Sequence, residues 1–282
     1  MAASRLDSRE LSLRSIDRQA GGENFPVASL LAPRAARPHL RAIYGFARLV
    51  DNIGDEAEGD RLALLDDLEV ELEACYRGAA RTPHMQRLQV TIAEKNLPRE
   101  PFRRLIEANR IDQRQDRYES WEDVRWYCMH SADPVGRLVL GIYDRLDQPD
   151  LVSMSDSVCT GLQLVNFLQD PPRDLALGRV YLPLEDLKAH GVRTRELGGP
   201  VTDRFRGLMR FEAARAADLL EPGIELGREL KGRIGASVAL FARGGMAALE
   251  ALERADWDVF SQRPAPSKWT FARLTLRQLL NR

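Results

Sequence analysis

Apolar and polar positions recur with a helical period along almost the whole chain. In Arg41–Asp51, the apolar residues Ile43, Phe46 and Val50 lie three or four positions apart, which places them on one face of a helix. Leu62–Tyr76 repeats the pattern, with its acidic and basic residues on the opposite face. We expect an amphipathic helix over each of these segments.

Prolines and glycines divide the chain into pieces of helix length. Alternating β-branched runs of strand length are nearly absent, and neither an internal repeat nor a long linker interrupts the pattern. From the spacing of these breaks and the usual length of helices, we expect one all-α domain of about eight to twelve helices. The prolines that mark the breaks are Pro33, Pro38, Pro83, Pro98, Pro134, Pro149, Pro183, Pro200, Pro222 and Pro264.

Composition and charge exclude several classes of protein. Apolar residues make up 44% of the chain and charged residues 29%, the balance of an ordinary globular protein. Lys and Arg total 41 against 42 Asp and Glu, so no basic excess favours a nucleic acid partner. Three widely spaced cysteines argue against a disulfide scaffold or a structural zinc site and favour a reducing cytoplasm. Because we find neither a signal peptide nor a membrane span, we expect a soluble or peripheral protein.

Three pairs of aspartates have the spacing of one helical turn. On a helix, residues four positions apart lie on the same face, so each pair would present two carboxylates together. A solvated helix face with arginine partners is the ordinary explanation for any single pair. The pairs are Asp51 with Asp55, Asp112 with Asp116, and Asp170 with Asp174.

The first and third pairs are accompanied by polar residues on otherwise apolar helix faces. Such residues usually need a buried partner or a ligand. Two acidic clusters that faced each other across a cavity would hold Mg²⁺, which completes its coordination shell with water and substrate phosphates. Bound in this way, the metal would neutralise a departing diphosphate. The polar neighbours are Tyr44 and Arg48 before the first pair, and Gln163, Asn166 and Gln169 before the third.

Segments that match one enzyme family run in that family's order from residue 23 onward. They are Glu23–Leu31 (ENFPVASLL), Ile43–Glu56 (IYGFARLVDNIGDE), Tyr127–Leu140 (YCMHSADPVGRLVL), Gly161–Leu187 (GLQLVNFLQDPPRDLALGRVYLPLEDL) and the tail Ser267–Leu280. In these segments the chain resembles the squalene/phytoene synthase branch of the trans-isoprenyl diphosphate synthases. ENFPVAS, NFLQD and RPAPSKW are most similar to the hydroxysqualene synthases of bacterial hopanoid pathways.

The resemblance implies a fold and a reaction. The fold would be an isoprenoid-synthase helical bundle around a central apolar cavity, over residues 23–282, after a polar leader over residues 1–22. The enzyme would be a carbon–oxygen lyase that uses Mg²⁺ to convert presqualene diphosphate into hydroxysqualene and diphosphate. Its partners would be this isoprenoid diphosphate and other enzymes of the squalene pathway. We expect a cytoplasmic protein with peripheral contact to the inner membrane.

The resemblance also implies roles for individual residues. Arg48 would stabilise the leaving diphosphate together with Mg²⁺, and apolar and aromatic walls would keep the cation from bulk water until one positioned water quenches it. The water's proton would pass to Tyr181 or to the released diphosphate. The implied metal ligands are Asp51, Asp55, Asp170 and Asp174. The implied substrate-binding residues are Ser29, Tyr44, Arg48, Gln163 and Asn166, and the implied catalytic residues are Tyr44, Arg48, Asn166 and Tyr181.

The chain departs from the family pattern at three places. Gln169 stands where condensing members carry an arginine before the second motif, which fits an enzyme that handles a single diphosphate. Pro171 and Pro172 follow Asp170 directly, so the preceding helix should kink or end there, with a new helix beginning at the prolines. In the first motif, Asn52 replaces an aspartate that many relatives carry.

Two other functions remain open at this point. One is condensation of two prenyl diphosphates to presqualene diphosphate, squalene or phytoene, against which Gln169 counts. The other is a non-catalytic role, because some relatives with degraded aspartate motifs serve as assembly factors for respiratory complexes. Pro171, Pro172 and Asn52 favour this second alternative.

Overall fold

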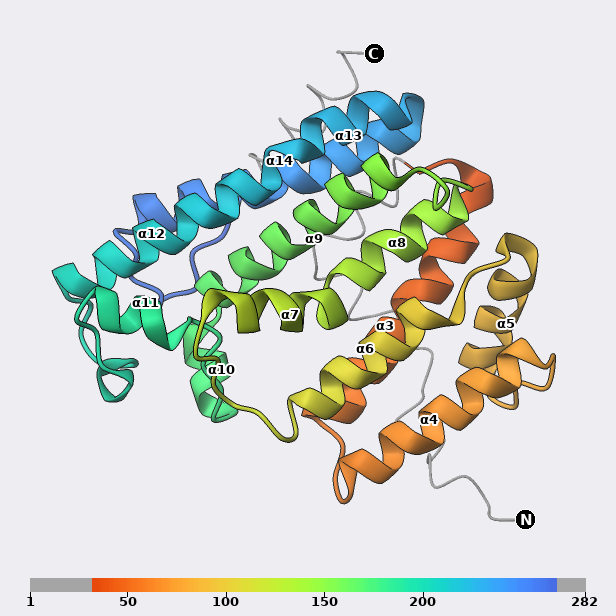
Figure 1. Ribbon diagram of the computed structural model, residues 1–282, viewed down its shortest axis with the longest axis horizontal. Helices are drawn as coiled ribbons and strands as arrows, with labels where there is room; N and C mark the ends of the chain where they lie inside the picture. The colour runs from red at the N-terminus through yellow and green to blue at the C-terminus, as the bar shows by residue number, and fades with distance from the viewer. Residues whose placement is uncertain (1–31, 268–282) are drawn as a thin grey trace. The chain divides into compact units, whose positions relative to one another are not determined.

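The protein is built from helices, as the sequence predicts. The structure is a computed structural model that describes residues 32–267, and within this range the β-type pairing is a single isolated bridge between Arg117 and Val180. The leader over residues 1–22 and Ser29 lie outside the described residues. The helices are η1 (Arg34–Ala36), α3 (Arg37–Asp55), α4 (Arg61–Tyr76), α5 (Pro83–Lys95), α6 (Arg99–Ile111), α7 (Trp121–Ser131), α8 (Asp133–Ile142), α9 (Pro149–Gln169), α10 (Pro171–Ala176), α11 (Leu184–Ala189), η2 (Thr194–Glu196), α12 (Asp203–Leu220), α13 (Pro222–Leu230) and α14 (Gly232–Arg254) (Figure 1).

Prolines begin several of these helices. Pro83, Pro149, Pro171 and Pro222 are the first residues of α5, α9, α10 and α13. A first-turn residue has no intrahelical partner for its N–H, so proline is tolerated there and its fixed φ favours the helix. Several of the breaks expected from the proline pattern are therefore helix starts.

The chain forms two compact units. Unit 1 comprises Met1–Arg114 and Pro134–Val152, and unit 2 comprises Gln115–Asp133 and Ser153–Arg282. Unit 1 contains α3 to α6 and nearly all of α8, while unit 2 contains α7, most of α9, and α10 to α14. The single domain expected over residues 23–282 stays a prediction.

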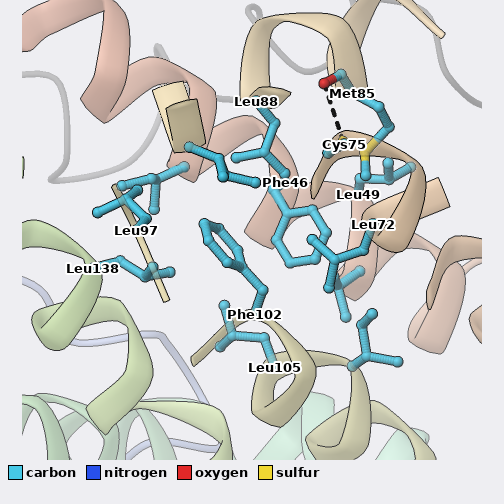
Figure 2. Packing of buried hydrophobic residues seen from close by; sticks show 14 of the residues in the cluster. Phe46, Leu49, Leu72, Cys75, Met85, Leu88, Leu97, Phe102, Leu105 and Leu138 are labelled. Atoms are coloured by element: carbon cyan, nitrogen blue, oxygen red, sulfur yellow. Dashed lines mark hydrogen bonds between the residues drawn. The ribbon is translucent and has the colours of Figure 1, made fainter. Parts of the chain in front are cut away.

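The core of unit 1 is made by apolar faces of α3 to α6 and α8. At its centre Phe46 of α3 meets Phe102 of α6 edge to face, with ring centroids 5.2 Å apart (Figure 2). Such a contact adds about 0.5–1.5 kcal/mol to the burial of the two rings. Between α4 and α5, the Cys75 thiol donates to the Met85 carbonyl oxygen at 3.3 Å, and burial raises the pKa of Cys75 to about 12. These contacts hold the helix that carries the first aspartate motif.

Small residues bring α13 and α14 of unit 2 close together. α12 and α13 follow one another in nearly the same direction, and α14 runs alongside them (Figure 1). A Cβ on Gly235 would overlap the carbonyl oxygen of Gly227, and a Cβ on Gly245 would lie 2.8 Å from the Leu220 side chain. Glycine at these positions therefore permits the close packing of α14 against α12 and α13. Among the described helices, α14 is also long and apolar enough to cross a membrane, although most of that stretch is buried in the structure.

A buried charged network joins α11 and α12 in unit 2. Arg215 Nη1 donates to Glu212 Oε2 at 2.7 Å and to Asp186 Oδ2 at 2.9 Å. The guanidinium also lies over the Trp121 ring, 4.6 Å from its centroid. Glu212 is completely buried, and this burial raises the pKa of its carboxyl group to about 8 despite the neighbouring Arg215. One arginine thus serves two carboxyl groups, and Glu212 keeps its proton near neutral pH.

Glu212 should make the stability of the protein depend on pH. Its folded pKa lies above its unfolded value, so its contribution is fully present below about pH 4.5 and is lost as the pH rises through about 8. Within this window each unit of pH lowers the free energy of unfolding by about 1.4 kcal/mol. We expect Glu212→Gln to remove this slope in urea unfolding measured between about pH 5 and 9.

The exposed Glu225 offers a matched control. It pairs with Arg228 at 2.9 Å on the surface of α13. Glu225→Gln should keep the wild-type pH slope. Equal slopes in all three proteins would show that the Glu212 carboxyl group is already ionised in the folded state.

Candidate functional site

The first aspartate motif lies at the carboxyl end of α3. Asp51 and Asp55 belong to this one helix and are one turn apart, as the spacing predicts. Arg48, one turn earlier, places its Nη1 3.8 Å from Asp51 Oδ2, and about half of the Asp51 side chain is exposed. Tyr44 is half-buried on the same helix. The structure therefore brings an arginine and two carboxylates together at one helix end.

Arg61 and Gln113 hold the backbone beneath this motif. Arg61 donates to the carbonyl oxygens of Gly54 and Asp55, each at 3.0 Å, and to that of Ala57 at 2.9 Å. Gln113 Nε2 donates to the Gly54 carbonyl oxygen at 3.0 Å. The last carbonyl groups of a helix lack intrahelical partners and carry partial negative charge, which a guanidinium compensates. These bonds use backbone oxygens, so they fix the helix end without consuming the aspartate side chains.

Gly54 allows α3 to approach α6 at the same point. A Cβ at position 54 would overlap Oδ1 of Asn109, a buried residue of α6. Glycine inside a helix costs about 1 kcal/mol relative to alanine, so its presence here has a packing reason. The glycine in the segment Asp51-Asn52-Ile53-Gly54-Asp55 sets the depth at which the motif sits in unit 1.

We expect Gly54→Ala to destabilise the protein by about 1–3 kcal/mol, because Asn109 must move to admit the methyl group. Urea unfolding measures the change. Gly45→Ala on the same helix is the matched control, since its Cβ would lie 3.7 Å from His84 Nδ1, an ordinary contact. That variant should gain up to about 1 kcal/mol from helix propensity. The packing explanation fails if both variants are equally stable.

The second aspartate motif spans the junction of two helices. α9 ends at Gln169, and α10 begins at Pro171 with Asp170 as its N-terminal cap residue at φ −114° and ψ 23°. The break and restart expected from the prolines is confirmed. The Asp174 N–H still donates to the Asp170 carbonyl oxygen at 3.0 Å, so the two aspartates remain one turn apart at the start of α10.

Two of the three aspartate pairs do not lie within one helix, contrary to the spacing argument. Asp170 precedes α10, because proline at the next position disfavours a helical backbone for the residue before it. The middle pair is divided because α6 ends at Ile111: Asp112 is the C-terminal cap residue and Asp116 is exposed beyond it. Only the pair in α3 has the full helical geometry.

A C-terminal segment contacts the second motif. Arg263 donates from Nη2 to Asp170 Oδ2 at 2.8 Å and from Nε to Asp170 Oδ1, so the guanidinium binds the carboxylate through two parallel bonds. Next to it, Gln169 Nε2 donates to the Pro264 carbonyl oxygen at 2.6 Å. Gln169 is therefore satisfied by the backbone, the ordinary explanation for a polar residue on an apolar helix face.

Aromatic side chains pack together close to the second motif in sequence. The Tyr181 ring stacks on Phe167 of α9 with centroids 4.1 Å apart and planes 7° apart. The ring centroids of Tyr127 and Tyr118 lie 5.3 Å and 5.8 Å from the ring centroid of Tyr181. Tyr181 is buried in this cluster. Of the other residues implied by the resemblance, Gln163 is half-buried and Asn166 exposed on α9.

Comparison with known proteins assigns the family. The family model described as squalene/phytoene synthase matches residues 18–270. The chain belongs to this family. It is 37% identical over 224 residues to the hydroxysqualene synthase of Rhodopseudomonas palustris, covering 77% of this chain and 75% of that protein. It is 32% identical over 265 residues to the 15-cis-phytoene synthase of Synechococcus elongatus, covering 88% of this chain and 85% of that protein.

Solved structures of this family share the fold. The crystal structure of squalene synthase HpnC from Alicyclobacillus acidocaldarius superposes with a TM-score of 0.80 and 43% sequence identity, covering 92% of this chain and 96% of that one. A dehydrosqualene synthase in complex with ligand superposes with a TM-score of 0.85 at 21% identity, over 97% of this chain and 96% of that one. The expected all-α isoprenoid-synthase fold is confirmed.

The donor atoms of both motifs suit a hard cation. Among the described residues, no three His, Cys, Asp or Glu side chains are grouped closely enough to hold a metal ion by themselves. Mg²⁺ commonly takes one or two carboxylates and completes its shell with water and substrate phosphates. A pair of aspartates fits this requirement, and Asp170 already holds a cationic group in the guanidinium of Arg263. The residues present therefore fit Mg²⁺ bound together with a diphosphate.

Sequence reasoning missed Arg263 and Arg61. Arg263 stands in the segment RPAPSKW, which was singled out for its resemblance, but nothing local assigns it to Asp170, 93 residues earlier. Arg61 follows the motif by only a few residues, at the start of α4, where an arginine is common in any polar stretch. A basic residue just after a helix that ends in acidic residues could have indicated a C-terminal capping role.

Proposed function

We propose that this member of the squalene/phytoene synthase family ionises presqualene diphosphate with the help of Mg²⁺ and lets water quench the cation, which yields hydroxysqualene and diphosphate. The observation that carries the proposal is the state of Gln169. At the position where condensing relatives carry an arginine, this side chain is neutral, buried and hydrogen-bonded to the Pro264 carbonyl oxygen. It offers no charge for a second diphosphate, which supports a substrate with only one.

The relatives support the same choice. They include hydroxysqualene synthases from Rhodopseudomonas palustris and Sinorhizobium fredii. Since presqualene diphosphate is itself a condensation product, the protein would depend on another enzyme of the squalene pathway to supply it. We propose a cytoplasmic location with peripheral membrane contact, because both the substrate and the product carry long apolar chains.

The first half of the reaction is the loss of diphosphate. When bound, Mg²⁺ would supply Lewis-acid stabilisation of the leaving group. Each aspartate pair, Asp51 with Asp55 and Asp170 with Asp174, would supply metal ligands, and Arg48 would bind a diphosphate oxygen through its guanidinium. The carbon–oxygen bond breaks with its electron pair passing to the diphosphate. Ser29, Tyr44, Gln163 and Asn166 would orient the diphosphate.

The second half is ring opening and capture by water. The buried aromatic cluster of Phe167, Tyr181 and Tyr127 would form the apolar wall beside the cation, which aromatic rings can stabilise. Water adds through its oxygen to the rearranged cation and loses one proton. Tyr181 or the released diphosphate would accept that proton. Exclusion of other water molecules limits the reaction to one quenching event.

The direct test is incubation of the purified protein with presqualene diphosphate and Mg²⁺, followed by mass spectrometry of the hexane extract. We expect hydroxysqualene, and we expect EDTA to abolish it because the leaving group then loses its counter-charge. A product that forms equally well in EDTA would contradict the metal assignment.

Substitution of the aspartates should grade their roles. Asp51→Asn and Asp170→Asn should each lower turnover on the order of 100-fold or more, since even residues that merely support metal ligands are worth 10- to 100-fold. For Asp174→Asn we expect a smaller loss, because the prolines leave Asp170 outside the helix that carries Asp174, so the two need not share a helix face. Circular dichroism should show an intact fold in each variant. Full activity of the Asp51 or Asp170 variant would overturn the assignment.

Condensation of two prenyl diphosphates is the second candidate. Similarity to the phytoene synthase of Synechococcus elongatus over most of both chains favours it. Farnesyl diphosphate supplied alone would then give presqualene diphosphate or squalene. A protein that is silent with both substrates and binds no Mg²⁺ would instead fit a non-catalytic assembly factor.

A further inference from the structure

Two consecutive residues of the C-terminal segment bind two consecutive residues of the second aspartate motif. Arg263 binds the Asp170 carboxylate through both of its oxygens, and the Pro264 carbonyl oxygen accepts from the Gln169 amide. We call these four residues the clasp. The arginine fork matches a carboxylate in geometry and charge, so it binds more specifically than a lysine would.

The segment that carries the clasp is anchored independently of it. After α14 ends at Arg254, Trp257 and Val259 are buried, and the Phe260 ring lies 5.4 Å from that of Phe205 on α12. Asp256 also accepts from Arg206 Nε at 2.7 Å. These contacts hold the backbone in place whether or not the Arg263 side chain is bound to Asp170.

The two halves of the clasp differ in exposure. Gln169 and Pro264 are buried, so their hydrogen bond is costly to break. The Arg263 side chain is 59% exposed, whereas that of Asp170 is 18% exposed. Because the Arg263 side chain is mostly exposed, its guanidinium can exchange Asp170 for water while the backbone stays in place, at the cost of the two charge-assisted hydrogen bonds.

Arg263 and a metal ion would use the same atoms. The guanidinium occupies one lone pair on each carboxylate oxygen of Asp170, and a cation bound to this carboxylate would approach those oxygens. Two cations at one carboxylate repel each other, so binding of one weakens binding of the other. Competition follows from the geometry of the clasp.

We propose that Arg263 is the resident counter-ion of Asp170, which a divalent metal ion must displace, and that Gln169 is the positioning residue that holds Arg263 there. The proposal rests on the assignment of Asp170 as a metal ligand under the proposed function. Arg263 would thus set the affinity of Asp170 for the metal, a role that is separate from stabilising the fold. Displacement of the side chain leaves the Gln169–Pro264 bond intact.

The proposal can be tested by a calorimetric titration. The substrate-free, full-length protein is titrated with Mg²⁺ alone, and the heat of binding gives the Mg²⁺ affinity. Arg263→Gln removes the competing charge and should tighten Mg²⁺ binding by at least roughly two- to fivefold, since a bidentate pair is at least as strong as an ordinary exposed ion pair. Arg263→Lys keeps the charge but loses the fork, so its affinity should lie between wild type and Arg263→Gln. Gln169→Leu, which frees the Pro264 carbonyl, should tighten binding by a smaller factor.

Arg254→Gln is the matched control, because it removes an exposed positive charge at the end of α14 and should leave Mg²⁺ affinity unchanged. Unchanged or weaker binding in Arg263→Gln would overturn the proposal, as would equal tightening in the control. In an Asp170→Asn background, Arg263→Gln should have no further effect.

The same titration separates the two proposals. Wild-type protein that binds Mg²⁺, together with an Arg263→Gln variant of equal affinity, would overturn the role of Arg263 and leave the proposed function standing. Wild-type protein that binds no Mg²⁺, and turns over presqualene diphosphate in EDTA, would overturn both.

Discussion

A carboxylate that is taken out of water must meet a cation or several hydrogen-bond donors, because an isolated buried charge costs several kcal/mol. This constraint recurs through both units. In each case an arginine from another segment or an adjacent turn donates hydrogen bonds to the carboxyl group or compensates its charge, and the pair then ties two parts of the chain together. The pairs are Glu71 with Arg81, Asp133 with Arg125, Glu212 with Arg215, and Asp170 with Arg263.

The Asp170 pair differs from the other three in how easily it can be exchanged. Glu71, Asp133 and Glu212 are at most 2% exposed, so loss of their arginine would leave a buried carboxyl group without its hydrogen-bond partner. Asp170 keeps access to water, and its arginine is mostly exposed. The same chemistry therefore gives ion pairs at different depths, and the pair of Asp170 is the one with access to water.

The two aspartate motifs position their carboxylates in different ways. In the first, one continuous helix carries both aspartates, and Arg61, Gln113 and the close approach at Gly54 fix its end. In the second, prolines interrupt the helix, and the backbone bond from Asp174 to Asp170 preserves the one-turn spacing. The prolines in this motif were a sequence argument for a non-catalytic protein. In the structure they remove Asp170 from a helical backbone but keep its one-turn spacing from Asp174.

Local rules written in the sequence determined the helices, the break at Asp170 and the positions of the carboxylates. Apolar periodicity acts over a few residues, and proline excludes a helical backbone at its neighbour, so both can be read from short segments. The partners of the polar groups were decided only by the tertiary structure. Gln169 binds the carbonyl group of Pro264, 95 residues later in the chain, and Asp170 binds the guanidinium of Arg263, 93 residues later. Both hydrogen bonds depend on how α12, α14 and the segment after them pack. No local pattern encodes such a contact, because it arises when packing brings distant segments within hydrogen-bond distance.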